Sequence, residues 1–196
     1  MTDYEDETIV VGSVVDADRG HLPYALVHGE SLVACAAWAL GQAGVRTVDL
    51  DSGWDQIQAE GWPIVLHDAL CPMTPAEFVA ECVEVSLAED SVVVGVRPVT
   101  DTVKVIADGQ VGATVDRDDL IAVTSPVVLP SSVVAALDGP PGSDLAALVS
   151  GLAAAGRPVR TIPAPAQGRR VASEEDLRVL EALTAPGSDE RELLGY

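Results

Sequence analysis

Two residues that could take part in catalysis or metal binding, His67 and Asp68, directly follow the apolar run 64–66. A carboxylate directly after a buried strand suits a Mg²⁺ ligand, because hard cations that accompany phosphates prefer oxygen. On spacing alone, Asp68 fits a turn or capping residue better, and His67 fits a half-buried histidine without a catalytic part. Both interpretations of Asp68 stay open at this point.

Cys71, three residues after Asp68, is a candidate nucleophile. No partner base is placed near it by sequence, so an inert buried thiol is the better interpretation. The chain has three cysteines in all, with neither CxxC nor Cys/His spacing. Together with the acidic start MTDYEDE, which lacks the features of a signal peptide, this cysteine usage predicts a reducing, cytoplasmic location.

The loop 16–23, after the first apolar run, contains Arg19 and Gly20 among two acidic residues. A loop that cradles phosphates usually carries several glycines and a lysine. Such a loop is therefore poorly supported here, and an ordinary surface connection is favoured.

A β-hairpin is predicted between residues 100 and 116, where two alternating β-rich stretches meet at Asp108-Gly109. It interrupts the rhythm of strands and helices, so we expect an arm that protrudes from the domain over about 99–117. Arg117 lies at one root of this arm. Its guanidinium is either solvated or carried into a partner subunit, where it would bind phosphate bidentately.

Charge and composition exclude several classes of function. Acidic side chains number 31 against 11 basic ones, which gives a formal net charge of -20 and argues against binding nucleic acid. Lys104 is the single lysine, so phosphate recognition must use arginine, backbone N–H groups or a metal. No apolar run approaches the roughly 20 residues of a membrane span.

The elements that must position these residues alternate between strands and helices, which predicts an α/β fold with a doubly wound, mostly parallel sheet. Thr74 with Glu77 is the expected start of one helix, and Ser173 with Asp176 the expected start of the last. We expect one domain over 1–183 and a flexible acidic tail over 184–196. The expected strands are 8–15, 45–50, 64–66, 91–96 and 159–162, and the expected helices are 31–42, 74–87, 130–137, 143–155 and 173–183.

The stretch 63–119 resembles the methylerythritol-phosphate cytidylyltransferases of isoprenoid biosynthesis. His-Asp-Ala-Leu-Cys-Pro at 67–72 stands where that family has His-Asp-Ala-Ala-Arg-Pro. Thr-Asp-Thr-Val-Lys at 100–104 and Thr-Val-Asp-Arg at 114–117 follow with natural spacing. A weaker likeness extends over most of 8–183. The resemblance implies a Rossmann-like fold of the nucleotide-diphospho-sugar transferase type, with a hairpin arm through which two copies form a homodimer.

The resemblance also implies roles for individual residues in transferring a cytidylyl group from CTP to a sugar-alcohol phosphate. Asp68 would lie next to Mg²⁺, and Arg117 would reach across the homodimer to the acceptor phosphate. Arg170 replaces a lysine that meets the nucleotide phosphates. The implied substrate-binding residues are Thr102, Ala69 and Ser125. Arg19, in a loosely aligned loop, is the implied nucleotide-binding residue.

Departures from the family pattern fall mainly on the nucleotide side. The family's loop lysine is Tyr24 here, the arginine of its His-Asp element is Cys71, and its Thr-Pro-Gln element ends in Val127. A Gly-Gly, Arg and Ser segment that holds cytosine and ribose is reduced to 51–62. Because losing one charge-stabilising donor typically costs a hundredfold or more in rate, we expect weak or lost transfer. The alternative is a non-catalytic dimeric module, a pseudoenzyme that retains an acceptor-like phosphate site.

Overall fold

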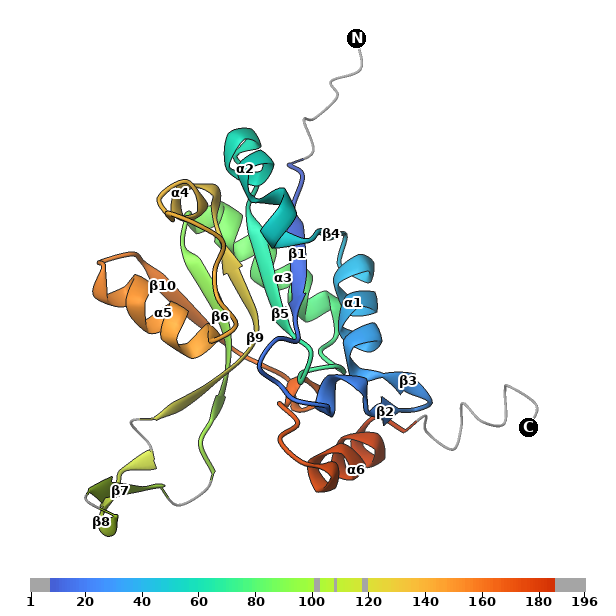
Figure 1. Ribbon diagram of the computed structural model, residues 1–196, viewed down its shortest axis with the longest axis vertical. Helices are drawn as coiled ribbons and strands as arrows, with labels where there is room; N and C mark the ends of the chain where they lie inside the picture. Colours follow the sequence, from blue (N-terminus) through green and yellow to red (C-terminus); the bar gives the residue numbers. More distant parts are fainter. Residues whose placement is uncertain (1–7, 101–102, 108, 118–119, 186–196) are drawn as a thin grey trace, which may run out of the picture.

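The computed structural model describes residues 8–185 except 101–102, 108 and 118–119. A twisted sheet runs through the centre of the molecule, with helices on both of its faces (Figure 1). Its strands are β1 (Val11–Val15), β4 (Arg46–Thr47), β5 (Ile64–Asp68), β6 (Val92–Pro98), β9 (Ile121–Leu129) and β10 (Val159–Pro163).

The six strands lie in the order β10-β6-β9-β5-β1-β4. Strand β9 is antiparallel to both of its neighbours, β5 and β6, whereas the other pairs are parallel. The predicted α/β class with a mostly parallel sheet is therefore confirmed. Within the described residues, no helix combines the length and apolar character that crossing a membrane requires.

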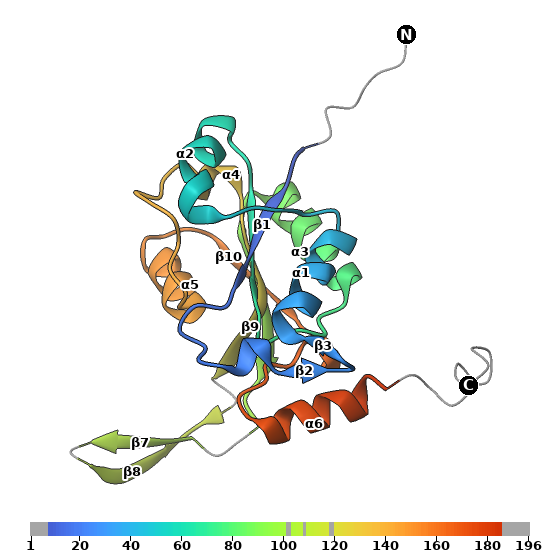
Figure 2. The same cartoon turned by 45° about the vertical axis from the view of Figure 1, so that its right-hand side comes forward.

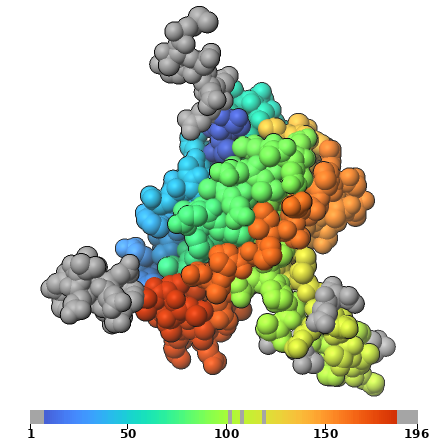
Figure 3. Space-filling model, turned by 180° about the vertical axis from the view of Figure 1, so that it is seen from behind, coloured from blue at the N-terminus to red at the C-terminus, as the bar shows by residue number. Residues whose placement is uncertain are grey.

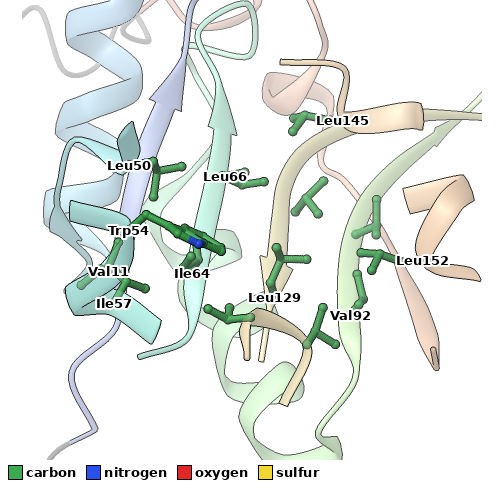
Figure 4. Packing of buried hydrophobic residues seen from close by; sticks show 14 of the residues in the cluster. Val11, Leu50, Trp54, Ile57, Ile64, Leu66, Val92, Leu129, Leu145 and Leu152 are labelled. Atoms are coloured by element: carbon green, nitrogen blue, oxygen red, sulfur yellow. The ribbon is translucent and has the colours of Figure 1, made fainter. Parts of the chain in front are cut away.

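Two apolar clusters sandwich the sheet because successive side chains of a buried strand point to opposite faces. On one face, Ile64, Leu66 and Leu129 pack with Trp54 and Leu152 of the covering helices (Figure 4). These helices are α2 (Leu50–Glu60), α4 (Ser131–Val134) and α5 (Leu145–Ala154). The other face is covered by α1 (Leu32–Gln42) and α3 (Ala76–Glu89), and Figure 2 shows these two helices side by side.

The carboxyl ends of β1 and β5 are covered by smaller elements. These are η1 (Leu22–Tyr24), the strand pair β2 (Leu26–Val27) and β3 (Glu30–Ser31), η3 (Ala166–Gly168) and α6 (Glu174–Leu183). A third cluster that includes Leu32, Leu70 and Leu180 holds them together. The Ser173 hydroxyl accepts a hydrogen bond from the Asp176 N–H at 3.1 Å, as expected for the cap of α6.

The hairpin is formed as predicted and projects away from the rest of the molecule (Figures 1 and 2). Strands β7 (Val103–Ala107) and β8 (Gln110–Val115) form a two-stranded sheet of their own. Gly109 has a φ of 76°, as a tight turn requires. The tail 186–196 and Asp108 lie outside the described residues.

Several elements differ from the expectations. The helix α2 was not predicted, and its first residue, Leu50, was expected to end a strand over 45–50. That strand shrinks to β4. The long central strand β9 was also not predicted. The N-cap of α3 is Pro75, because the Thr74 hydroxyl donates instead to the Cys71 carbonyl at 2.9 Å.

Candidate functional site

A cavity of about 530 Å³ opens beyond the carboxyl ends of β1 and β5. Ligands of open α/β sheets bind at this edge. Five parts of the chain meet there: the loop after β1, the end of β5, strand β9, the start of α5, and the segment before α6. The lining residues are Asp18, Arg19, Asp68, Val123, Thr124, Ser143, Asp144, Leu145, Ala146 and Arg170.

Asp68 holds two arginines that come from distant parts of the chain. The Nε of Arg19 donates to Oδ1 of Asp68 at 3.2 Å, and the Nε of Arg170 donates to Oδ2 at 3.0 Å. Oδ1 also accepts the N–H of Leu70 at 2.9 Å. Three of the predicted site residues are thus brought together in one charge-assisted cluster.

The two guanidinium groups differ in their exposure and in the number of N–H groups left to bind a ligand. Arg19 is only 11% exposed and donates further to the carbonyls of Ser143 at 2.7 Å and Ala17 at 3.4 Å. The side chain of Arg170 is 39% exposed. Among the described residues, neither of its Nη atoms has a hydrogen-bond partner. Arg170 is therefore the cation of the cluster that can meet an anion in the cavity.

The loop after β1 is tied to the start of α5 by a reciprocal pair of contacts. Besides the bond from Arg19 to the Ser143 carbonyl, the Ser143 hydroxyl donates to Asp18 at 2.7 Å. Asp144 caps α5 by accepting the Ala147 N–H at 2.9 Å. Two cationic and three anionic side chains line the cavity, so its formal charge is about -1. The cavity therefore has no excess positive charge to offer a polyphosphate ligand.

Ser125 lies behind the cavity and is fully buried. Its hydroxyl accepts the Asp68 N–H at 2.9 Å and shares a hydrogen bond of 2.6 Å with Nδ1 of His67. His67 is also fully buried, so the expected half-buried position is wrong. Its Nε2 has no partner within the described part of the chain. Burial lowers the pKa of His67 to about 4, although the adjacent Asp68 opposes this shift.

We expect the stability of the protein to fall in acid because of His67. The unfolded chain takes up the imidazole proton below pH 6.5, whereas the folded protein resists it down to about pH 4. The corresponding stability is fully present above pH 6.5 and is lost as the pH falls to 4, by about 3 kcal/mol. Urea unfolding of wild type and His67→Gln should show a stability difference that shrinks by this amount over the window. A stability difference between the two proteins that does not change with pH would contradict the lowered pKa of His67.

Cys71 is a thiol held neutral beneath the cluster. It is fully buried, and burial, reinforced by the neighbouring Asp68 carboxylate, raises its pKa well above the usual range. Its N–H donates to the Asp68 carbonyl at 2.8 Å. A buried thiol with a raised pKa is a poor nucleophile, which agrees with the inert interpretation.

Ala69 and Arg117, two further predicted site residues, do not line this cavity. Ala69 is buried, and its N–H donates to the Val15 carbonyl at 3.0 Å. Thr102 lies outside the described residues. Arg117 donates to the Thr100 carbonyl at 2.9 Å and lines a separate hollow on the hairpin with Thr114, Val115 and Asp116.

The lining residues that sequence reasoning missed include two with hydroxyl groups, Thr124 and Ser143. The Oγ1 of Thr124 is buried without a hydrogen-bond partner in the described part of the chain. Thr124 and Ser125 are consecutive strand residues, so when one points to the cavity the other points away. Ser143 carried a detectable signal, because it precedes the helix-capping Asp144.

The arrangement of these residues does not fit a bound divalent cation. Each Asp68 oxygen already accepts a hydrogen bond from an arginine, and a cation placed there would face two guanidiniums. Asp18 and Asp144 are engaged by Ser143 and the α5 backbone. No group of three potential ligands among His, Cys, Asp and Glu gathers anywhere in the described residues. The suggested Mg²⁺ contact of Asp68 would require the arginines to leave it.

Comparisons with known proteins agree on one family. The family model described as 2-C-methyl-D-erythritol 4-phosphate cytidylyltransferase matches residues 41–185. A protein of that name from Frankia casuarinae is 38% identical over 135 residues, which cover 65% of this chain and 50% of the relative. Another from Symbiobacterium thermophilum is 30% identical over 91% of this chain and 73% of the relative. The chain thus spans about half the length of the Frankia relative.

A solved structure supports the same architecture. The cytidylyltransferase of that name from Thermus thermophilus superposes with a TM-score of 0.65, covering 91% of this chain and all of the other. Sequence identity is 20%, so this likeness concerns the fold.

Proposed function

This chain belongs to the 2-C-methyl-D-erythritol 4-phosphate cytidylyltransferase family, and from this premise we propose that its cavity binds CTP and a sugar-alcohol phosphate. The reaction would be cytidylyl transfer in isoprenoid precursor synthesis, at a weak or vestigial rate. One observation carries the proposal: Arg19, Asp68 and Arg170 converge from three segments at the edge of the sheet where such folds bind ligands.

In the proposed reaction, an oxygen of the acceptor phosphate attacks the α-phosphorus of CTP and pyrophosphate leaves. Such a transfer depends on positioning and on stabilising negative charge. Asp68 orients Arg170 through its Nε, which leaves the two Nη atoms for phosphate oxygens. Arg19 fixes the first loop against α5. Family members generally depend on a divalent metal ion, but the arrangement around Asp68 does not fit one, because both of its carboxylate oxygens accept hydrogen bonds from arginines.

Two observations support weak activity. Residues 51–62, where the family holds cytosine and ribose, are largely committed to α2, whose Trp54 and Ile57 are buried against the sheet. The cavity has a formal charge of about -1, whereas a triphosphate requires cations around it. The same two observations favour the second candidate function, a non-catalytic module that binds a smaller phosphorylated molecule through Arg170.

Calorimetry with CTP in the presence of Mg²⁺ tests the proposed function. Binding in the micromolar range, lost in Arg170→Ala, would support the transferase. Absence of heat with CTP, together with binding of a sugar-alcohol phosphate, would support the non-catalytic module. Arg178→Ala is the matched control, because Arg178 pairs with Glu174 on the exposed face of α6.

We also propose a homodimer formed through the hairpin. The isolated arm exposes large apolar side chains, among them Val105, Ile106 and Val111, of which Ile106 is 72% exposed. A two-stranded ribbon is marginal in water, and pairing with the same arm of a second copy would cover these residues. Light scattering at micromolar concentration should give twice the chain mass, and a monomeric peak would reject the dimer.

Arg117→Ala should separate ligand binding from assembly. Arg117 is exposed and its hydrogen bond to the Thr100 carbonyl lies at the surface, so its loss should change the unfolding midpoint little. If the arm carries this guanidinium into the partner's cavity, affinity for a sugar-alcohol phosphate should fall at least tenfold. Calorimetry measures the affinity, with light scattering and thermal unfolding as controls. Equal affinities in wild type and variant would discard the trans contact.

A further inference from the structure

A second and larger hollow lies on the opposite face of the sheet, between α1 and α3. Its volume is about 970 Å³, and it is distinct from the cavity at Asp68. Alanines of both helices, including Ala39 and Ala80, and the prolines that precede α3 line it. Figure 3 shows the face on which the blue surface of α1 meets the green surface of α3. We refer to this hollow as the α1/α3 groove.

The surface of the groove is unusual for this chain. Helix α1 contains no charged residue along its 11 positions, although 21% of the whole chain is charged. Trp38 projects from it and is 68% exposed. A contiguous apolar surface of this kind marks a binding site more often than an ordinary solvated face. Trp is also the residue type most enriched among those that dominate binding energy at interfaces.

The charges around the groove indicate which partner it fits. Glu30 and Glu77 are the only charged residues that line it within the described chain, and both are acidic. Each stands at the start of a helix, Glu30 just before α1 and Glu77 in the first turn of α3. Glutamates beside an exposed indole favour a ligand that joins apolar and cationic groups, since cations also stack on the face of Trp.

Other occupants fit this surface poorly. If a second copy of this chain bound here, its Glu30 and Glu77 would lie close to Glu30 and Glu77 of the first copy. Each chain also carries a formal charge of -20, so the two copies would repel one another. An anionic bilayer or nucleic acid would meet no basic residue among those that line the groove in the described chain.

We propose that the α1/α3 groove binds a basic amphipathic helix of another protein. The apolar face of that helix packs on Trp38 and the alanines, and its lysines or arginines meet Glu30 and Glu77. Helix α1 is about 16 Å long, so three turns of partner helix span it, in the manner of known helix-in-groove complexes. This site is independent of the proposed transfer reaction.

The test titrates ¹⁵N-labelled protein with a synthetic 14-residue amphipathic helix of leucine, alanine and lysine. We expect amide shifts confined to α1, the first turns of α3 and their flanking loops. A scrambled peptide of the same composition and a version with glutamate in place of lysine should bind at least tenfold more weakly. Equal binding of the scrambled peptide, or shifts centred elsewhere, would overturn the proposal.

Two pairs of matched variants place the interaction on the groove. Ala80→Gln fills it without adding a charge and should weaken peptide binding at least tenfold, whereas Ala88→Gln, on an exposed part of α3, should not. Glu30→Gln with Glu77→Gln should weaken binding about threefold to tenfold. The control for this pair is Glu81→Gln with Glu84→Gln, which lie outside the groove. Unchanged affinity in both groove variants would also overturn the proposal.

Discussion

Gly95→Ala is expected to lower the free energy of unfolding by about 3 kcal/mol. A Cβ at this position would lie 2.6 Å from the carbonyl oxygen of Ser125 and 2.9 Å from its carbonyl carbon, and both are backbone atoms that cannot swing aside. The pairing of β6 with β9 shifts register between Val94 and Val96, so Gly95 sits where the two strands approach most irregularly. Accommodating the methyl group would push Ser125 away from Asp68 and His67.

Gly151→Ala is the matched control for this substitution. Gly151 lies inside α5, and an added Cβ there has no neighbour within 4 Å. Alanine should therefore raise stability by about 0.5–1 kcal/mol through helix propensity and a less flexible unfolded chain. Urea unfolding of the two variants should give effects of opposite sign. A Gly95→Ala protein as stable as wild type would refute the close approach.

Asp68→Ala should cost about 3 kcal/mol in the free energy of unfolding. The substitution removes the acceptor of two guanidiniums and of the Leu70 N–H at once. Truncating one partner of a buried ion pair leaves the other charge uncompensated, which is the costly case. Arg170 can turn to solvent because it is 39% exposed, whereas Arg19 cannot, so we expect the lower end of the usual range.

Glu174→Ala provides the comparison with a surface ion pair. Glu174 and Arg178 are 3.9 Å apart and both are largely exposed on α6. Such pairs contribute about 0.5 kcal/mol or less. Denaturant unfolding of both alanine variants under the same conditions measures the contrast. A small effect of Asp68→Ala, equal to that of Glu174→Ala, would show that the cluster does not stabilise the fold.

Local signals in the sequence were sufficient for the hairpin and for the last helix. An Asp-Gly pair between two stretches of alternating polarity strongly favours a β-hairpin, and β7 and β8 form one. Ser173 with Asp176 forms the expected cap of the last helix. The convergence of Asp68 with Arg170 had no such signal. These residues are 102 positions apart, so only the resemblance to a family pointed to both of them.

The missed elements have physical explanations. Proline cannot donate to a strand ladder, so Pro126 makes the central strand β9 an unusual one that local patterns do not predict. In β9 it lies within the irregular stretch opposite Gly95, where the regular pairing is interrupted. The helix α2 did have a signal, since Leu50, Trp54 and Ile57 recur at helical spacing. That signal was hidden by Gly53 and by the many polar residues between them.

The antiparallel strand β9 has a consequence for how the protein is made. It occupies the middle of the sheet between β5 and β6, yet it is synthesised after both. A nascent chain that has reached the hairpin therefore carries three bare strand edges, one on β5 and two on β6, because β9 and β10 are not yet made. Unpaired edges of this kind invite pairing with other chains. The growing polypeptide consequently passes through an aggregation-prone interval that shortens when β9 emerges and closes only when β10, which ends at Pro163, has followed.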